Sequence, residues 1–513
     1  MGSAYIDRIL RARVYDVATE TPLELASRLS RRLGARVWFK REDLQPVFSF
    51  KLRGAYNKIV SLSAERRKAG VVAASAGNHA QGVALAAQRL GVAATIVMPV
   101  TTPSIKVEAV RSYGARVELH GDGYDEAYAH AVAMAQDNGA EFIHPFDDPD
   151  VIAGQGTVAM EILRQHPDPI DAVYVPIGGG GLISGVAEFI KYVHPSTRVI
   201  GVEPDDAPSM YRALKAKRRV RLSEVGLFAD GAAVRQVGAE TLKICRRLVD
   251  EVVLVSTDEI CAAIKDVFED TRSIAEPAGA LSVAGLKKHL GKRADGGNYV
   301  AIVSGANINF DRLRHVAERA EVGEQREFLL AVTIPEEPGS FLQFCKILGK
   351  RRITEFNYRY SGPQSAQVFV GVEISRSSSE RVEMIERLRA RGLAVTDMTD
   401  NELAKLHIRY MVGGRSDEVR DESIFKLMFP ERPGALLQFL SHIGTRWNIS
   451  LFHYRNHGAA YGRVLIGLQL STAERREFLA AVREAGYSVD DETENPAYRL
   501  FVSTRGESER SDG

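Results

Sequence analysis

The stretch Ser49-Phe50-Lys51-Leu52-Arg53-Gly54-Ala55 decides the fold. It places one lysine between an aromatic residue and the start of a predicted helix, residues 52–62. Lys51 is therefore a candidate Schiff-base lysine, since a partly desolvated pocket helps a lysine to lose its proton and act as nucleophile or base. Three later motifs strengthen this interpretation, and each follows an apolar run: Ser75-Ala76-Gly77-Asn78-His79, Gly178-Gly179-Gly180-Gly181 and Ser304-Gly305-Ala306-Asn307.

Short apolar runs alternate with predicted helices over the first 300 residues. Continuous β-branched runs are typical of strands that are buried on both faces of a parallel sheet. The alternation predicts an α/β fold whose ligands bind beyond the carboxyl ends of the strands, where the three polar motifs lie. The predicted strands are 37–40, 71–75, 94–98, 117–119, 141–143, 172–176, 199–202 and 299–303, and the helices include 80–90, 106–113, 124–138, 156–164, 182–193, 257–268 and 278–289.

The four glycines lie directly between a predicted strand and a predicted helix. Their backbone N–H groups are free to surround an anion, and the helix N-terminus adds partial positive charge. The pattern is neither GxGxxG nor a Walker motif, so dinucleotide and nucleoside-triphosphate sites are disfavoured. A phosphate cradle is the functional interpretation, and a flexible turn is the alternative.

The polar motif at residues 75–79 has two interpretations as well. Ser75, Gly77, Asn78 and His79 begin a predicted helix, which is a natural anion site, and the Asn78 amide can bond a phenolic oxygen or a carboxylate. Alternatively, Ser75 or Asn78 is an N-cap that satisfies backbone donors, and His79 is a buried, hydrogen-bonded histidine. Ser304 could likewise be a simple turn residue after its strand.

Composition excludes several classes of protein. The 513 residues carry 67 Lys and Arg against 66 Asp and Glu, so no basic field favours nucleic acid. No apolar run reaches the eighteen or so residues of a membrane span. Three scattered cysteines fit neither a disulfide framework nor a zinc site, and we expect no metal. The N-terminal residues show no signal-peptide pattern, and a cytoplasmic location is expected.

The last third of the chain contains an internal repeat. Residues 328–344 match 425–439, residues 356–359 match 452–455, and residues 368–372 match 464–468. Each copy predicts the order strand, Pro-Gly turn, helix, strand, strand, helix, strand. This is the order of a ferredoxin-like α+β module.

The combined motifs resemble the fold type II pyridoxal-phosphate enzymes of the biosynthetic threonine dehydratase family. The resemblance covers nearly the whole chain and includes Glu276-Pro277-Ala278-Gly279-Ala280. It implies a tryptophan synthase β-like catalytic domain with mainly parallel sheets, followed by two ferredoxin-like, ACT-like regulatory modules. The implied parts are the pyridoxal-phosphate-dependent catalytic domain 1–316, a linker 317–326, module 1 at 327–410, module 2 at 423–504 and a disordered tail 505–513.

The resemblance also implies roles for individual residues around pyridoxal 5'-phosphate. Lys51 would bind the cofactor covalently, Phe50 would lie against its ring, and Asn78 would bond the ring hydroxyl. Ser304 would face the ring nitrogen. The substrate carboxylate would be placed by Ser75, Gly77, Asn78 and His79, and the cofactor phosphate by Gly178, Gly179, Gly180, Gly181 and Leu182.

The implied activity is β-elimination from L-threonine, and more weakly from L-serine, to 2-oxobutanoate or pyruvate and ammonia. This is the first committed step of isoleucine biosynthesis. The family implies isoleucine as inhibitor, valine as counteracting activator and a homotetramer. Two alternatives stay open, a β-replacement enzyme of the same fold and a non-catalytic amino-acid sensor. The sequence does not place ligands for a cation near Glu203.

Overall fold

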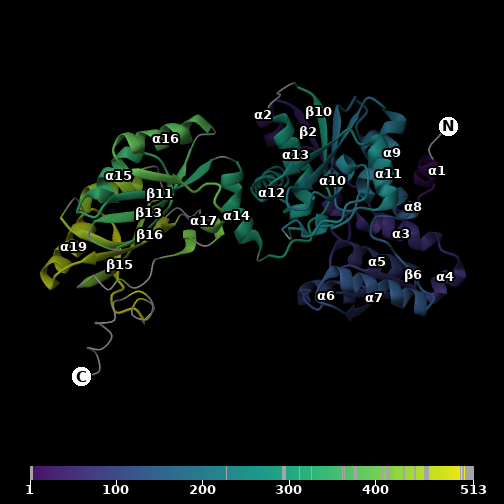
Figure 1. Ribbon diagram of the computed structural model, residues 1–513, viewed down its shortest axis with the longest axis horizontal. Coiled ribbons are helices and arrows are strands. Elements are labelled where there is room, and N and C mark those ends of the chain that lie inside the picture. The colour runs from purple at the N-terminus through teal and green to yellow at the C-terminus, as the bar shows by residue number, and fades with distance from the viewer. Residues whose placement is uncertain are drawn as a thin grey trace. The chain divides into compact units, whose positions relative to one another are not determined.

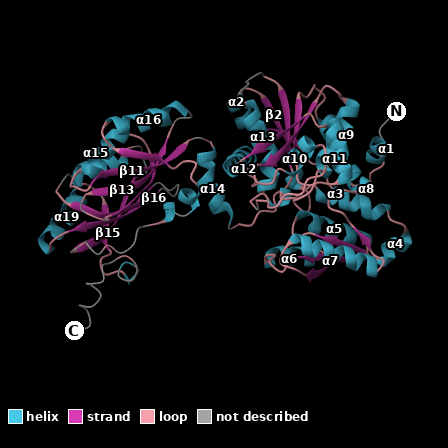
Figure 2. Ribbon diagram, viewed as in Figure 1, coloured by secondary structure: helices cyan, strands magenta, loops and turns pink. Residues whose placement is uncertain are grey.

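Two compact units make up the chain in the computed structural model, residues 1–323 and 324–513 (Figure 1). Each unit has its own sheets and helices (Figure 2). The structure describes residues 4–502 except 227, 292–295, 311, 325, 361, 363, 375–377, 407, 412–415, 417, 418, 420, 431–433, 444, 445, 456–460, 497 and 499–501. The predicted tail, 505–513, lies outside the described residues.

A six-stranded sheet forms the centre of the larger part of the first unit. Its order is β1-β2-β10-β7-β8-β9, and every pair is parallel except β1 with β2. Both faces are buried, as the sequence predicts: Val300 and Ile302 of β10 enter one core, while Ala301 and Val303 enter the other. The strands are β1 (Leu23–Leu25), β2 (Arg36–Arg41), β7 (Ala172–Pro176), β8 (Arg198–Pro204), β9 (Glu251–Val255) and β10 (Asn298–Val303).

A second, four-stranded parallel sheet organises the smaller part of the first unit. Its order is β5-β4-β3-β6, and the chain enters it after the helix that carries Lys51. Figure 1 shows helices α5, α6 and α7 beside this sheet. The strands are β3 (Val71–Ala74), β4 (Ala94–Met98), β5 (Arg116–Leu119) and β6 (Glu141–Phe142).

Helices connect the strands and cover both sheets. Those of the first unit are α1 (Ala4–Leu10), α2 (Ser27–Leu33), α3 (Lys51–Ser61), α4 (Ala64–Ala69), α5 (Asn78–Leu90), α6 (Ser104–Arg111), α7 (Tyr124–Asp137), α8 (Pro149–Gln165), α9 (Gly181–Val193), α10 (Ser209–Ala216), α11 (Ala239–Leu248), α12 (Thr257–Thr271), α13 (Pro277–Leu290) and α14 (Arg312–Gly323). Two 3-10 turns, η1 (Glu42–Leu44) and η2 (Asp230–Ala232), complete the set. None of these described helices, nor those of the second unit, combines the length and apolar character needed to cross a bilayer.

Helix α8 begins seven residues before the predicted start at residue 156. The Asp148 carboxylate accepts hydrogen bonds from the backbone N–H groups of Asp150 at 2.8 Å and Val151 at 3.1 Å, and Pro149 occupies the first turn. This Asp-Pro pair is a helix-start signal that the apolar periodicity alone does not reveal.

A buried cluster of charges fixes α3 to its neighbours. The Arg53 guanidinium donates to Glu42 at 2.8 Å and to Glu161 of α8 at 2.6 Å, and Lys40 of β2 donates to Glu161 at 2.6 Å. All four side chains are fully buried, so two cations and two carboxylates balance one another. Since Arg53 lies two residues after Lys51, the cluster holds the start of α3 between β2 and α8.

The predicted linker, 317–326, coincides largely with α14. Arg319 pairs with Asp258 of α12, and Lys265 of α12 donates to Glu321 at 2.5 Å. Gly323 lies so close to α12 that an added Cβ would approach the Asp258 carbonyl oxygen. This helix therefore packs as part of the first unit, and the two units divide after Gly323.

The second unit contains one continuous eight-stranded sheet. Its order is β14-β11-β13-β12-β16-β17-β15-β18, and each half has the strand order 4-1-3-2 of a ferredoxin-like module. The halves join where β12 pairs antiparallel with β16. The strands are β11 (Glu327–Pro335), β12 (Ile353–Arg359), β13 (Ser365–Glu373), β14 (Ala394–Asp397), β15 (Glu422–Pro430), β16 (Asn448–Arg455), β17 (Tyr461–Gln469) and β18 (Ser488–Asp491).

One hydrophobic core serves both halves of this sheet. Side chains of four helices share it, namely α15 (Ser340–Leu348), α16 (Ser378–Ala390), α18 (Ala435–Ile443) and α19 (Thr472–Glu484). Two short elements follow β14, α17 (Glu402–Leu406) and η3 (Ile408–Tyr410). A buried ion pair also joins the halves, because Arg359 of β12 pairs with Glu422 of β15. Ser450 and Tyr498 donate to the same carboxylate. The repeats therefore fold as one body.

Candidate active site

A single cavity of about 1280 Å³ in the first unit brings the sequence motifs together. The motifs reach it from the ends of β3, β7 and β10 and from the start of α3. All twelve predicted site residues line it: Phe50, Lys51, Ser75, Gly77, Asn78, His79, Gly178, Gly179, Gly180, Gly181, Leu182 and Ser304. Residues as far apart as 50 and 304 thus share one site.

Lys51 is the first residue of α3, and its amine faces the cavity. The Nζ atom donates to the Pro145 carbonyl at 3.2 Å and lies 5.3 Å from the centre of the Phe50 ring. Burial lowers the pKa of the lysine to about 8, and the charge of Glu276 partly opposes this shift. A lysine with this pKa is neutral often enough near pH 7 to act as a nucleophile.

The glycine loop packs too closely against its neighbours to accommodate side chains. A Cβ added to Gly179 would lie 2.2 Å from the Phe146 ring, and one added to Gly180 would lie 2.9 Å from Thr241. Gly180 also has a φ of 96°, which favours glycine. The Thr241 hydroxyl donates to the Gly179 carbonyl at 2.8 Å, which turns that carbonyl away from the loop's N–H groups. The loop therefore forms an anion cradle at the start of α9, and it fits a phosphate.

The segment between β3 and α5 contains the motif at residues 75–79, for which the sequence left open a helix cap or an anion site. Ser75 accepts a hydrogen bond from the Gly77 N–H at 3.2 Å. The N-cap of α5 is Gly77, and no side chain caps the helix. The Asn78 side chain does not cap the helix but donates to Glu276 at 2.5 Å. Neither Ser75 nor Asn78 is therefore the N-cap of α5, although Ser75 does satisfy the backbone donor of Gly77.

His79 is buried, and its Nε2 atom lies 2.8 Å from the Ile143 carbonyl oxygen. Burial, with a contribution from the Lys51 charge, lowers the pKa of this imidazole to about 3. The ring is therefore neutral and donates its N–H to Ile143. This geometry favours the buried, hydrogen-bonded interpretation of His79 over direct contact with an anion.

Ser304 directly follows β10 and is 4% exposed. Its hydroxyl lies 3.4 Å from the Ala278 carbonyl, a long hydrogen bond that leaves the hydroxyl able to turn toward a ligand in the cavity. The backbone around it is held by neighbours, since the Phe50 N–H donates to the Ser304 carbonyl at 3.3 Å. Ser304 and the lysine loop thus keep a fixed separation.

Several residues of the site lie outside the predicted set. Phe146 packs beneath the glycine loop, and the Asp147 carboxylate accepts the N–H groups of Ala239 and Glu240 at the start of α11. Glu276 and Asn307 belong to motifs that the sequence singles out, but the sequence assigns no role to them. Residues 144–147 carry no local sequence pattern that would mark them as part of a site.

Glu203 is held by the protein itself. Its carboxylate accepts hydrogen bonds from the backbone N–H groups of Met210 and Tyr211, each at 2.8 Å, at the start of α10. Burial raises the pKa of this carboxyl to about 7. Within the described ranges, no group of three His, Cys, Asp or Glu side chains is arranged to hold a metal ion.

Comparisons with known proteins agree with the fold. Residues 14–305 match the family model described as pyridoxal-phosphate dependent enzyme, and residues 318–408 and 413–502 match the C-terminal regulatory domain of threonine dehydratase. The biosynthetic L-threonine dehydratase of Burkholderia multivorans is 56% identical, over 97% of this chain and 99% of that protein.

Two solved structures resemble the first unit. The processed form of threonine deaminase isoform 2 from Solanum lycopersicum gives a TM-score of 0.61 at 54% identity, covering 62% of this chain and 92% of that chain. Maize serine racemase gives a TM-score of 0.58 at 35% identity, covering 61% and 96%.

A lysine in a desolvated cavity, a glycine cradle and two covered parallel sheets define a pyridoxal-phosphate-dependent enzyme of fold type II, which confirms the predicted fold class and cofactor. Within that class, the near full-length identity and the paired regulatory domain show that the chain belongs to the biosynthetic threonine dehydratase family.

The pKa of Lys51 predicts how fast the apoprotein captures its cofactor. The neutral amine is the reactive form, and below a pKa of about 8 its fraction rises about tenfold for each pH unit. We expect the capture rate to rise about tenfold from pH 6 to pH 7 and to level off above pH 8, as the visible absorbance after mixing would report. A rate that does not change between pH 6 and pH 8 would contradict the assignment.

Proposed function

We propose that this protein removes the β-hydroxyl group and the amino group of L-threonine, giving 2-oxobutanoate and ammonia, with L-serine as a weaker substrate. The observation that carries the proposal is the convergence of Lys51, the glycine cradle and the Asn78 segment on one cavity. The paired regulatory domain adds support, because its family model is that of threonine dehydratase.

Separate residues would bind the cofactor and transfer the proton. The N–H groups of 178–182 would hold the phosphate of the cofactor, Phe50 would pack against its ring, and Ser304 would face the ring nitrogen. When bound, pyridoxal phosphate supplies the electron sink for the charge left by removal of the substrate α-proton. The Lys51 amine would accept that proton, the substrate C–O bond would break, and the hydroxyl would leave as water with the proton returned by the Lys51 ammonium. The released enamine product then takes up water and loses ammonia.

Substrate orientation falls to the segment that begins α5. Ser75 and the backbone at Gly77 face the cavity at the positive end of the helix, where a carboxylate is favoured. His79, the fourth predicted substrate-binding residue, would support this segment from the protein side through its bond to Ile143. A fixed carboxylate places the α-proton within reach of the Lys51 amine.

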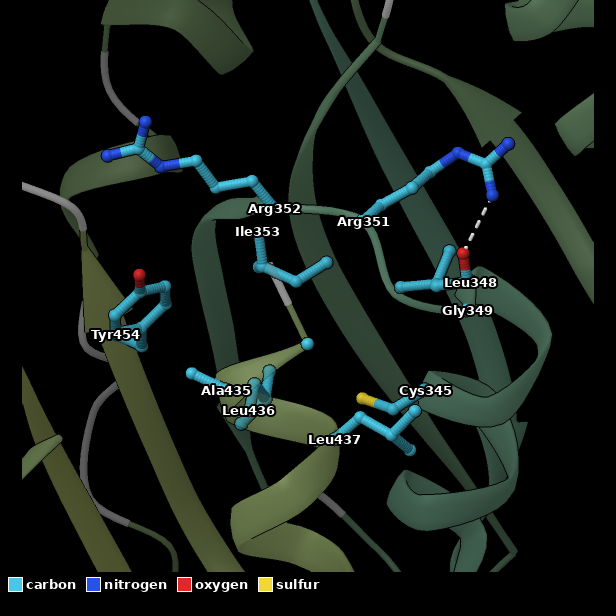
Figure 3. A pocket seen from close by; sticks show the side chains of 11 residues that line it. Cys345, Leu348, Gly349, Arg351, Arg352, Ile353, Ala435, Leu436, Leu437 and Tyr454 are labelled. Carbon is cyan, nitrogen blue, oxygen red and sulfur yellow. Dashed lines mark hydrogen bonds between the residues drawn. The ribbon is translucent and has the colours of Figure 1, made fainter. Parts of the chain in front are cut away.

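A candidate effector site lies between the two halves of the second unit. Figure 3 shows Cys345 of α15 and Leu436 of α18 converging with Ile353, and the Arg351 and Arg352 guanidinium groups at opposite edges. Arg351 donates to the Leu348 carbonyl at 2.9 Å. The eleven lining residues are Cys345, Leu348, Gly349, Arg351, Arg352, Ile353, Gly434, Ala435, Leu436, Leu437 and Tyr454.

Apolar walls with arginines at the rim suit a branched amino acid such as isoleucine, the expected inhibitor, or valine, the expected counteracting activator. The cavity measures only about 10 Å³, which is room for one water molecule. An amino acid would therefore have to part α15 from α18. A differential affinity of a few kcal/mol for the opened form would be enough for control of the enzyme.

The direct test is formation of 2-oxobutanoate from L-threonine by the purified protein, with and without isoleucine. Activity that isoleucine suppresses supports both the catalytic and the regulatory assignment. Activity that ignores isoleucine would keep the first and remove the second. Bound cofactor without elimination would favour the β-replacement enzyme, and a protein that binds amino acids but no cofactor would favour the sensor. Sedimentation of the same sample tests the proposed homotetramer.

Filling the candidate effector site should relieve inhibition. Replacing Ala435 by leucine adds bulk to a closed pocket, and overpacking of this kind is expected to raise the half-inhibitory isoleucine concentration at least about tenfold. Ser441 lies exposed on the same helix, so Ser441→Leu is the matched control and should leave inhibition unchanged. Equal inhibition of both variants would place the effector elsewhere.

A further inference from the structure

The Glu276 carboxylate lies behind Asn78 at the wall of the cavity. It is 4% exposed and belongs to no step of the proposed reaction. The Asn78 Nδ2 group donates to its Oε1 atom at 2.5 Å. An added Cβ at Gly305 would come within 2.7 Å of the same oxygen, so the loop after β10 leaves space for this carboxylate.

The opposite end of the Asn78 amide is held by Asn307. The Asn307 Nδ2 group donates to the Asn78 Oδ1 atom at 2.6 Å and to the Val47 carbonyl at 2.8 Å. A backbone carbonyl can only accept, so the contact with Val47 fixes which way Asn307 points. Asn307 must then meet the oxygen of Asn78, and the nitrogen of Asn78 must meet Glu276.

These two contacts leave one group of Asn78 for a ligand. An amide nitrogen carries two N–H bonds, and only one goes to Glu276. Among the residues that the structure describes, the second N–H has no protein acceptor, and Asn78 lines the cavity. The side chain therefore offers an N–H donor to the cavity, while its oxygen is directed at Asn307.

We propose that Glu276 is a positioning residue that, together with Asn307, locks the Asn78 amide so that it presents an N–H donor to the ring hydroxyl of the cofactor. The proposal rests on the proposed function, in which Asn78 bonds that hydroxyl. A locked donor favours the ionised hydroxyl, and a freely flipping amide would offer its oxygen part of the time and oppose ionisation.

The charges around Glu276 are consistent with this role. Burial, reinforced by Asp230 of η2, raises the pKa of Glu276 to about 7, while the Asn78 bond and Lys106 of α6 lower it. The Lys51 amine faces the same carboxylate from α3. Both protonation states keep a carbonyl-type oxygen that can accept from Asn78, so the lock works on either side of pH 7.

The test compares Glu276→Gln with Glu276→Leu in the holoenzyme. Glutamine keeps an oxygen at the same reach, whereas leucine keeps only the bulk. We expect the glutamine variant to hold pyridoxal phosphate within about threefold of the wild type and to keep its visible absorbance band. The leucine variant should lose about 10- to 100-fold in cofactor affinity, and the pH midpoint of its absorbance band should rise.

Asn307→Leu provides a second, independent break of the same lock and should show the same rise in the pH midpoint. Leucine and glutamine variants with the same midpoint and affinity would overturn the proposal, as would an unchanged midpoint in Asn307→Leu. The activity of the wild-type protein distinguishes failure of this proposal from failure of the proposed function. A wild type that does not dehydrate threonine refutes the function itself, whatever the variants show.

Discussion

Replacing Lys51 by alanine is expected to reduce threonine dehydration at least about 10⁴-fold, because in the proposed reaction one amine serves as covalent anchor and as base. Lys51 lines the same cavity as the glycine loop, and its lowered pKa suits it to both tasks. The measurement is 2-oxobutanoate formation at saturating threonine, together with the visible absorbance of the purified variant.

Lys58 offers the matched control. It lies seven residues further along α3, where its amine pairs with Asp148 at 2.8 Å and with Glu141 at 3.3 Å, outside the cavity. Lys58→Ala should keep the absorbance band and nearly all activity. A Lys51→Ala protein that folds, binds pyridoxal phosphate and retains more than about 1% of wild-type turnover would rule out the assigned role.

Replacing Gly179 by alanine should lower the affinity for pyridoxal phosphate at least about 100-fold. The φ of Gly179 lies outside the left-handed region, so alanine fits the backbone there and the cost is steric. Its Cβ would lie 2.2 Å from the Phe146 ring, and either the ring or the loop must move by more than an ångström. A displaced loop no longer directs its N–H groups at one point. Equilibrium titration of the apoprotein with cofactor measures the change.

Phe146 supplies the rescue for this variant. Phe146→Ala removes the Cγ and Cδ atoms that the alanine at position 179 would meet, so the double variant should regain most of the lost affinity. Thermal unfolding of both proteins reports whether the fold itself changed. Failure of the double variant to bind more tightly than Gly179→Ala, with both proteins folded, would show that the cradle does not depend on this contact.

Local sequence patterns were sufficient for most of the parallel sheets. The predicted strands 94–98 and 172–176 coincide with β4 and β7, because a continuous apolar run bounded by turn residues is compatible with little else. Helix starts were harder: α8 begins at Pro149, since the Asp148 cap precedes the first apolar residue of the helix. The motifs around Lys51, Gly178 and Ser304 were visible for the same local reason.

Contacts between distant residues could not be predicted in this way. Glu276 reaches Asn78 across 198 positions and Asn307 reaches it across 229, and no periodicity records such a meeting. The buried cluster of Arg53, Glu42 and Glu161 is equally invisible, because charged residues in a sequence are expected on the surface. These residues became neighbours only when the strands were ordered in the sheet.

In the second unit too, the sequence determined some features and the tertiary structure determined others. The repeat by itself determined two ferredoxin-like modules, since each copy carries its own turn, helix and alternating strands. Only the tertiary structure decided that β12 pairs with β16 and that both modules share one sheet and one core. Propensity and periodicity act within a few residues, so the sequence alone reveals the elements that they determine. Edge pairing and the burial of charges depend instead on which surfaces remain after each module has folded.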